Sequence, residues 1–136
     1  LNMSTYPSSL TLKHLALRVT NLAACEHFYV TVLGMRVIWR PDPDNVYLSN
    51  GQDNLALHQV TTPLLSGDHK QALDHLGFVL EQPQDLAAWS THLVTHQVPI
   101  RAPIKHHRDG SSSLYCADPE GNIIQIIYLP TITSGL

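Results

Sequence analysis

Residues that define specialised protein classes are scarce in this sequence. Its 136 residues include only two cysteines, Cys25 and Cys116, and neither stands in a Cys-x-x-Cys or zinc-finger spacing. A disulfide framework and a cysteine-based metal site are therefore excluded. We expect both thiols to be small buried side chains in a reducing compartment.

Charge and long apolar runs are also scarce. Charged residues make up 14% of the sequence, the formal net charge is −3, and Lys and Arg form no basic stripe. Neither nucleic acid nor an anionic membrane is therefore expected as a partner. No apolar run approaches the roughly 20 residues of a membrane span, and no signal peptide is apparent, so we expect a cytoplasmic protein. The large uncharged surface favours self-association.

The chain contains an internal repeat, which indicates its architecture. Residues 12–19 (LKHLALRV) return as residues 73–80 (LDHLGFVL), with His14 and His75 at the third position of the two copies. Each copy leads into a similar helix-start sequence. Since half of this chain is too short for a comfortable core of its own, we expect one shared core in a single domain, 1–136.

Periodicity predicts the same five elements in each half. Each half reads as a strand, a helix and three strands, with Asn21 as an N-cap, Gly34 as a left-handed C-cap and an Asn50-Gly51 turn in the first half. The expected ranges are 12–20, 22–33, 35–40, 46–48 and 54–60 in module one (12–60), a linker at 61–72, and 73–81, a helix after Pro83, 98–104, 112–117 and 122–129 in module two (73–129).

Proline and apolar spacing add further expectations within these elements. Residues 41–44 (Pro-Asp-Pro-Asp) should not be part of a strand, because proline interrupts a sheet. The strand 98–104 also contains prolines and is expected at an edge. The apolar stripe of the second helix is expected to comprise Leu86, Trp89, Leu93 and Val94. A loose tail is expected from residue 130.

Two βαβββ modules that share a curved mixed sheet give an α+β fold, with half-barrels that carry the helices on their outer face. Strand parity places the bulky apolar residues on the helical side and both His14 and His75 on the open side. Their small neighbours Ala16 and Gly77 leave room for a ligand. Two histidines at matching repeat positions favour a metal or substrate role over the alternative, which is rings that merely line a wet groove.

Three features of the sequence resemble the vicinal oxygen chelate superfamily, which includes glyoxalase I, fosfomycin- and bleomycin-resistance proteins and extradiol dioxygenases. They are the paired HLAL and HLGF segments (14–17 and 75–78), the YVTVLGM run (29–35) and the DPEGNIIQI segment (118–126). The resemblance extends over residues 12–129. These motifs are specific for the superfamily and weak for any one activity within it.

The resemblance implies a divalent metal ion (Zn, Ni, Co, Fe or Mn) held by His14, His75 and Gln125, with a fourth ligand position on the strand 54–60. Family members usually have glutamate at the position of Gln125. A glutamine oxygen can coordinate a metal but brings no charge. The alternative, in which Gln125 only hydrogen-bonds a ligand or water, therefore has nearly the same weight as metal binding. The resemblance also implies a homodimer in which half-barrels close across two chains.

The function implied is a small-molecule enzyme of the glyoxalase or dioxygenase type, such as a lyase, in which the metal chelates two adjacent oxygens of the substrate. The alternative is a metal-free protein that binds a drug or metabolite, as bleomycin-resistance proteins do. The paired histidines favour the enzyme, and the missing carboxylate favours the binding protein.

Three further residues are expected to contact the substrate. His58 faces the open side by parity; if the fourth ligand position falls instead on Ala56, that ligand is absent and His58 is a neighbour. Tyr47 and Tyr115 lie on strands that flank the groove, although a core aromatic role is slightly favoured for both. The sequence His106-His107-Arg108 is expected to be a solvated loop tip unless the loop folds over the groove.

Overall fold

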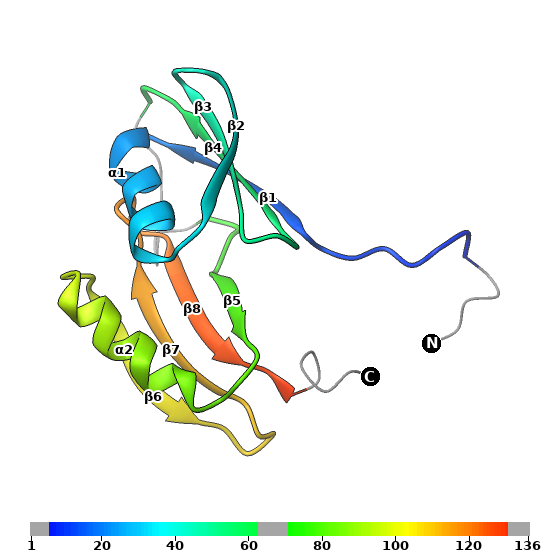
Figure 1. The fold of residues 1–136 in the computed structure, drawn as a ribbon, viewed down its shortest axis with the longest axis vertical. Helices are drawn as coiled ribbons and strands as arrows, with labels where there is room; N and C mark the ends of the chain where they lie inside the picture. Colours follow the sequence, from blue (N-terminus) through cyan, green and yellow to red (C-terminus); the bar gives the residue numbers. More distant parts are fainter. Residues whose placement is uncertain (1–5, 63–70, 131–136) are drawn as a thin grey trace.

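Each half of the repeat folds into a four-stranded sheet that carries helical segments (Figure 1). The computed structural model describes residues 6–62 and 71–130. The elements of the first half are β1 (His14–Val19), α1 (Leu22–Glu26), η1 (His27–Val32), β2 (Arg36–Asp42), β3 (Asn45–Ser49) and β4 (Asn54–Gln59). Those of the second half are β5 (Leu76–Leu80), α2 (Asp85–Thr95), β6 (Ile100–His106), β7 (Ser112–Ala117) and β8 (Ile123–Tyr128).

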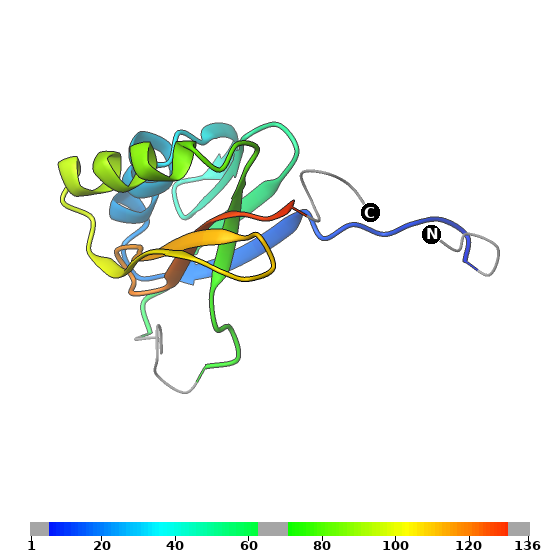
Figure 2. The same cartoon turned by 90° about the horizontal axis from the view of Figure 1, so that it is seen from below.

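The two sheets have the same topology, which confirms the predicted α+β fold of two βαβββ modules. Their strand orders are β1-β4-β3-β2 and β5-β8-β7-β6. In each sheet the first and fourth strands of the module pair in parallel and the other neighbours are antiparallel. Both sheets curve, and Figure 2 shows the helical segments of both modules on the same side of the sheets. The opposite face of each sheet is left open.

The first helical segment begins and ends where the sequence predicts. The Asn21 side chain accepts a hydrogen bond from the backbone N–H of Ala24 at 3.0 Å, and Gly34 ends the segment with φ +84°, which is a left-handed conformation that favours glycine. The segment is not uniformly α-helical, because α1 gives way to the π-helical η1 at His27. Six residues of apolar spacing are too few to distinguish these two helix types.

The expectation that residues 41–44 form no strand is wrong for the first two of them. β2 continues through Pro41 to Asp42. It lies at the edge of its sheet, and the register slips between Trp39 and Asp42, so the missing N–H of the proline interrupts no ladder there. The other proline-containing strand, β6, is an edge strand, as predicted.

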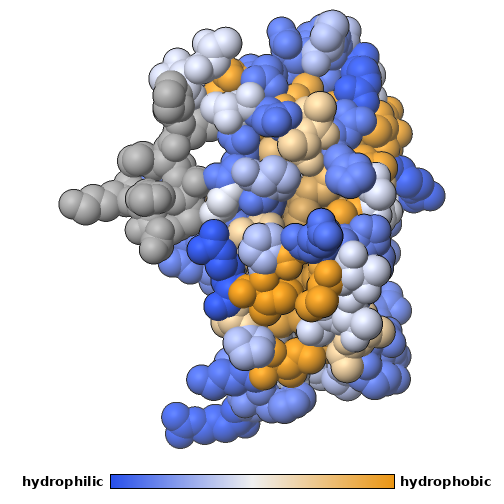
Figure 3. Space-filling model, turned by 90° about the vertical axis from the view of Figure 1, so that its left-hand side faces the viewer, coloured by the Kyte–Doolittle hydropathy of each residue, from blue (hydrophilic) through white to orange (hydrophobic). Residues whose placement is uncertain are grey.

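The apolar stripe of α2 is narrower than predicted. Leu86 and Leu93 are buried, and Trp89 packs partly against the same core, whereas Val94 is 62% exposed. Positions 86, 89 and 93 share one face of a helix, and position 94 is turned about 100° away from position 93. Figure 3 shows apolar side chains interspersed with polar ones on the helix-bearing face.

One hydrophobic cluster includes buried side chains from both modules. Hydrogen bonds between three pairs of residues also join the modules. Tyr29 Oη donates to Asp118 Oδ2 at 2.6 Å, the backbone N–H and the hydroxyl of Thr20 donate to Glu120 Oε1 at 2.6 and 2.8 Å, and His92 Nε2 donates to the carbonyl of Val32 at 2.7 Å. Within the described residues, no helix is long and apolar enough to cross a bilayer. Most of the predicted linker (61–72) and the tail after residue 130 lie outside those residues.

Candidate functional site

Five of the six residues predicted from the sequence to form the site lie on strands of the two sheets, and His75 directly precedes β5. In β1, His14, Ala16 and Arg18 are exposed, whereas Leu17 and Val19 are buried under the helical side. The register of β1 with β4 places Asn54 beside His14, Ala56 beside Ala16 and His58 beside Arg18. On the second sheet, Gln125 stands between Gly77 and Tyr115.

His14, the first residue of β1, is fixed by its neighbour on β4. Its Nδ1 lies 2.7 Å from Asn54 Oδ1. Since a carbonyl oxygen can only accept, Nδ1 carries the proton of the neutral ring. Nε2 is therefore left as the atom with the free lone pair.

His75 lies just before β5 and is held in a similar way. Its Nδ1 donates to Asp74 Oδ2 at 2.6 Å, and its side chain is 33% exposed. The ring also packs edge-on against Tyr115, with centroids 5.4 Å apart. A neutral His75 thus presents Nε2 as an acceptor, as His14 does. Asp74 was not predicted as part of the site, because alternation along the expected strand 73–81 assigns it to the face of Leu76 and Phe78, whereas β5 begins only at Leu76.

Gln125 forms the third part of this arrangement on the second sheet. Its Nε2 donates to the hydroxyl of Tyr115 at 3.0 Å. Its Oε1 lies toward Gly77, because a Cβ on that glycine would stand 3.8 Å from the oxygen. The structure thus brings His75, Tyr115 and Gln125 together, and the absence of a side chain at Gly77 leaves the amide oxygen accessible.

An aromatic row occupies the open face of the first sheet. Tyr47 stacks on Trp39 with centroids 4.9 Å apart and meets the ring of His58 edge-on at 6.0 Å. His58 Nδ1 lies 2.5 Å from Asn45 Oδ1, its register partner on β3. Trp39 was not among the residues predicted from the sequence to form the site. Its alternation with Val37 and its place opposite Tyr47 in the hairpin were the signals that could have identified it.

The strand register identifies the residue that corresponds to Gln125 in the first module. Ala16 and Gly77 each lie two residues after the repeat histidine, and they pair with Ala56 and Gln125, respectively. Ala56 is therefore the repeat equivalent of Gln125, and it is fully buried. By this equivalence an alanine occupies the first-module position that corresponds to Gln125, and His58 lies two residues further along β4.

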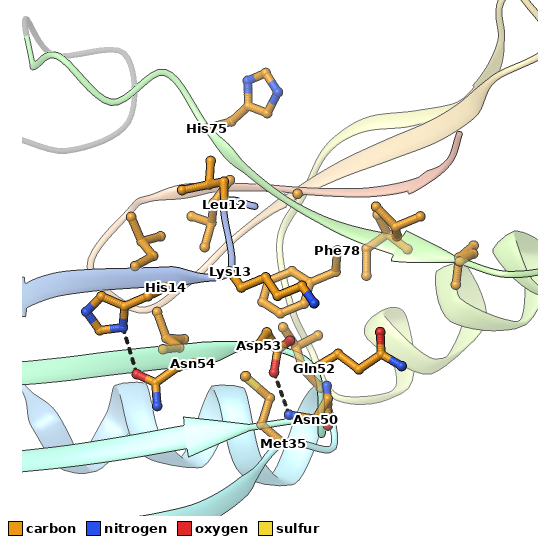
Figure 4. A pocket seen from close by; sticks show the side chains of 18 of the residues that line it. Leu12, Lys13, His14, Met35, Asn50, Gln52, Asp53, Asn54, His75 and Phe78 are labelled. Carbon is orange, nitrogen blue, oxygen red and sulfur yellow. Dashed lines mark hydrogen bonds between the residues drawn. The ribbon is translucent and has the colours of Figure 1, made fainter. Parts of the chain in front are cut away.

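A cavity of about 660 Å³ lies between β1 and β5, the edge strands at which the two sheets approach each other. Its walls include His14, His75, Leu55 and Phe78, with Lys13 at the rim. In Figure 4 the two imidazole rings lie well apart and do not point toward each other. Within residues 6–62 and 71–130, no three His, Cys, Asp or Glu side chains converge as a metal site would require. One chain alone therefore does not bring the two histidines together.

A smaller cavity of about 280 Å³ opens beside Tyr115 on the second sheet. It is lined by Ala102, Pro103, Ile104, Lys105, His107, Ser113 and Tyr115. His107 is exposed, as expected for a solvated loop residue, and its Nε2 also lies 3.3 Å from Ser113 Oγ. The β6–β7 turn contains Gly110, with φ +91°, a left-handed conformation that favours glycine.

Ionisable groups buried in the core lie apart from the open faces. Burial, followed by the charge of Asp118, raises the pKa of both Cys25 and Cys116 to about 12. Burial and the same carboxylate also raise the pKa of Tyr29. Both cysteines are free and buried, as expected, and their raised pKa makes them poor nucleophiles.

Comparisons with known proteins give a family and several structural relatives. Residues 11–126 match the family described as the Glyoxalase/Bleomycin resistance protein/Dioxygenase superfamily. A lactoylglutathione lyase from Agrobacterium tumefaciens is 22% identical, with a TM-score of 0.71 over 90% of this chain and 96% of that one. A glyoxalase-related enzyme from Fulvimarina pelagi is 20% identical, with a TM-score of 0.71 over 89% of each chain.

An integron cassette protein from the mobile metagenome of a sewage outfall at Halifax Harbour is also similar. It is 21% identical, with a TM-score of 0.73 over 88% of this chain and 98% of that one. No curated protein matches the sequence. At these identities, the structural relatives establish the fold and leave the activity open.

Proposed function

Because the chain belongs to the Glyoxalase/Bleomycin resistance protein/Dioxygenase superfamily, we propose that it is a small-molecule enzyme that uses a divalent metal ion held by His14 and His75. The observation that carries this proposal is the common state of the two rings. Each Nδ1 is fixed by an oxygen acceptor, which leaves Nε2 without a hydrogen-bond partner among the described residues. Histidine ligands in metal sites typically donate their other N–H to such an oxygen, which sets the tautomer and the ring orientation.

Gln125 fits the same donor set. Its amide N–H₂ is engaged by Tyr115, so its carbonyl oxygen is oriented as the available donor. A set dominated by imidazole favours Zn, Ni or Co over Mg or Ca. A bound ion would act as a Lewis acid on two adjacent substrate oxygens and stabilise the negative charge that develops on them.

The neighbouring residues of the chain would position the substrate. Ala16 and Gly77 have little or no side chain, which leaves space for a substrate beside His14 and His75. Tyr115 positions the Gln125 amide through a hydrogen bond and the His75 ring through an edge-on contact. The neighbouring rings of Tyr47 and His58 would contact the substrate from the first sheet. The reaction remains of the glyoxalase or dioxygenase type in this proposal, such as an isomerisation or ring opening.

We further propose that the protein acts as a homodimer in which a half-barrel of one chain completes that of the other. β1 and β5 each have an unpaired edge in the sheets described, and exposed edges are usually covered by another chain or element. The N-terminal arm leaves the body at β1 (Figure 1), and its Leu10 and Leu12 are both 95% exposed. A second copy that covers these features would bring His14 of one chain to His75 of the other. The two free thiols fit a cytoplasmic location.

Metal-free binding of a drug or metabolite is the second candidate function. It is favoured by the donor set itself, because neither Ala56 nor Gln125 carries the negative charge that would balance a divalent ion. The stacked pair Trp39–Tyr47 also offers a flat aromatic surface on which a ligand could rest. Metal analysis separates the two functions.

The experiment is metal analysis of protein purified without a histidine tag, followed by titration with Zn²⁺, Ni²⁺ and Co²⁺. We expect a stoichiometric ion in the unmodified protein and at least about tenfold weaker binding in His75→Ala and His14→Ala, because each loses a direct ligand. His96→Ala is the matched control, since this exposed ring lies at the end of α2, and it should retain the ion. Failure of the unmodified protein to bind any of the three metals would support the binding protein instead.

A further inference from the structure

The smaller cavity on the second sheet combines an apolar floor with a polar end. Ala102, Pro103 and Ile104 supply the floor at the register slip in β6. Lys105, His107 and Ser113 supply the polar groups. β-Bulges commonly redirect side chains beside functional sites, and this one places Lys105 opposite Ser113 on the open face.

The polar end of the cavity is rich in hydrogen-bond donors. Lys105 contributes an ammonium group, and the Ser113 hydroxyl and the His107 ring, whose Oγ and Nε2 lie 3.3 Å apart, add further polar groups. No carboxylate lines this cavity within the described residues. The nearest acid on the adjoining turn is Asp109, whose carboxylate accepts from both the N–H and the hydroxyl of Ser111. Hydrogen bonds from Ser111 lower the pKa of Asp109, and the charge of His107 contributes further, so Asp109 stays ionised and directed toward its own turn.

The cavity adjoins the proposed reaction site through Tyr115. Tyr115 lines the cavity, its hydroxyl accepts a hydrogen bond from Gln125 Nε2, and its ring contacts the ring of His75 edge-on. Ser113 lies two residues before Tyr115 on β7, which is a distance of roughly 7 Å along a strand. A short ligand with its charged end at Lys105 would therefore place its other end beside Gln125.

We propose that this cavity is a subsite for the carboxylate of a small organic acid whose apolar body lies along Ala102, Pro103 and Ile104. One lysine matches a monovalent carboxylate better than a divalent phosphate, because it supplies a single fixed charge. The inference deepens the proposed function, since it assigns a substrate class to the same open face, and it rests on that function for the role of the face. It assigns to Lys105 and His107 the binding of the substrate end remote from the metal.

The test uses the full chain, treated with a chelator so that no metal ion contributes. Hexanoate, its uncharged counterpart hexanamide and hexylphosphonate are titrated at low ionic strength, and backbone amide shifts are followed by NMR. We expect hexanoate to shift the amides of residues 102–107 and 113–115 and to bind more tightly than the other two probes. Lys105→Gln should weaken hexanoate binding about fivefold, as expected for a partly exposed ion pair. Lys105→Arg should restore most of the affinity.

Arg101→Gln is the matched control, because it removes the same charge from the same strand without touching the cavity. It should leave the affinity for hexanoate within about twofold. Equal binding of hexanoate and hexanamide, tighter binding of hexylphosphonate, equal losses in Lys105→Gln and Arg101→Gln, or the absence of shifts at these residues would each overturn the proposal. Because the protein is metal-free throughout, these outcomes are distinct from a failure to bind metal, which would overturn the proposed function instead.

Discussion

At the scale of single residues, Asp118 stabilises its own turn in the second module and also contacts the first module. Its carboxylate accepts from the backbone N–H groups of Glu120 and Asn122 and from the Asn122 side chain, which holds the turn in place. It also accepts from Tyr29 Oη at 2.6 Å. Tyr29 and Asp118 belong to two of the segments that carry the family resemblance, so these motifs join the two modules as well as shape them.

The first prediction concerns this contact. Tyr29→Phe should lower the free energy of unfolding by about 1–3 kcal/mol, because it removes a donor from a buried carboxylate without creating a large cavity. Urea unfolding followed by circular dichroism measures the change. Tyr6→Phe, at a side chain that is 68% exposed, is the control and should have little effect. A Tyr29→Phe variant as stable as the unmodified protein would show that the bond does not hold the modules together.

At the scale of elements, the alternation of side chains along strands was predictable and the register between strands was not. Period-two patterning correctly places His14, His58 and Gln125 on open faces, since one face of each strand must be apolar against the helices. It cannot tell which residues lie side by side. The equivalence of Ala56 and Gln125 emerges only from the pairings of β1 with β4 and of β5 with β8.

The same limit explains the errors in the strand and helix boundaries. Pro41 lies within β2 because the slipped register at a sheet edge tolerates it, and a local rule cannot know which strand is the edge. The register of β6 slips between Ala102 and Lys105 just before the β6–β7 turn, and such local geometry is weakly encoded in a polar sequence. Asn54, which orients His14, is a neighbour that only the folded chain reveals, and the hydrogen bond between Asp74 and the adjacent His75 likewise depends on the local backbone conformation.

A second prediction tests the donor set on β8. Gln125→Glu should strengthen binding of a divalent ion by about tenfold, or about 1.4 kcal/mol, because it adds a negative charge without changing the shape of the side chain. The Tyr115 hydroxyl can donate to the new carboxylate, so the fold should be retained. Titration with Zn²⁺ monitored by calorimetry measures the change, with Gln97→Glu, on the loop after α2, as the control. Unchanged affinity in Gln125→Glu would remove residue 125 from the metal site.

At the scale of the whole molecule, the duplicated modules have two similar open faces. Within one chain, His14 of the first module and His75 of the second lie apart (Figure 4). The two faces share a topology and differ in chemistry: the first carries the aromatic row of Trp39, Tyr47 and His58, and the second carries Tyr115 and Gln125. The unpaired edges of β1 and β5 and the exposed arm before β1 give a second chain a place to bind. The proposal therefore requires two chains to form one site.

The measurement that tests this account most directly is metal analysis of a mixed dimer. Chains with His14→Ala and chains with His75→Ala are produced together with two different affinity tags, neither of them histidine-rich, and the mixed dimer is isolated through both tags. Each parent variant should bind no stoichiometric ion, whereas the mixed dimer should bind one, because its second site combines an intact His14 with an intact His75 from different chains. A mixed dimer as free of metal as its parents, or a parent that retains the ion, would contradict the claim that two repeat-related histidines from two subunits hold one metal ion.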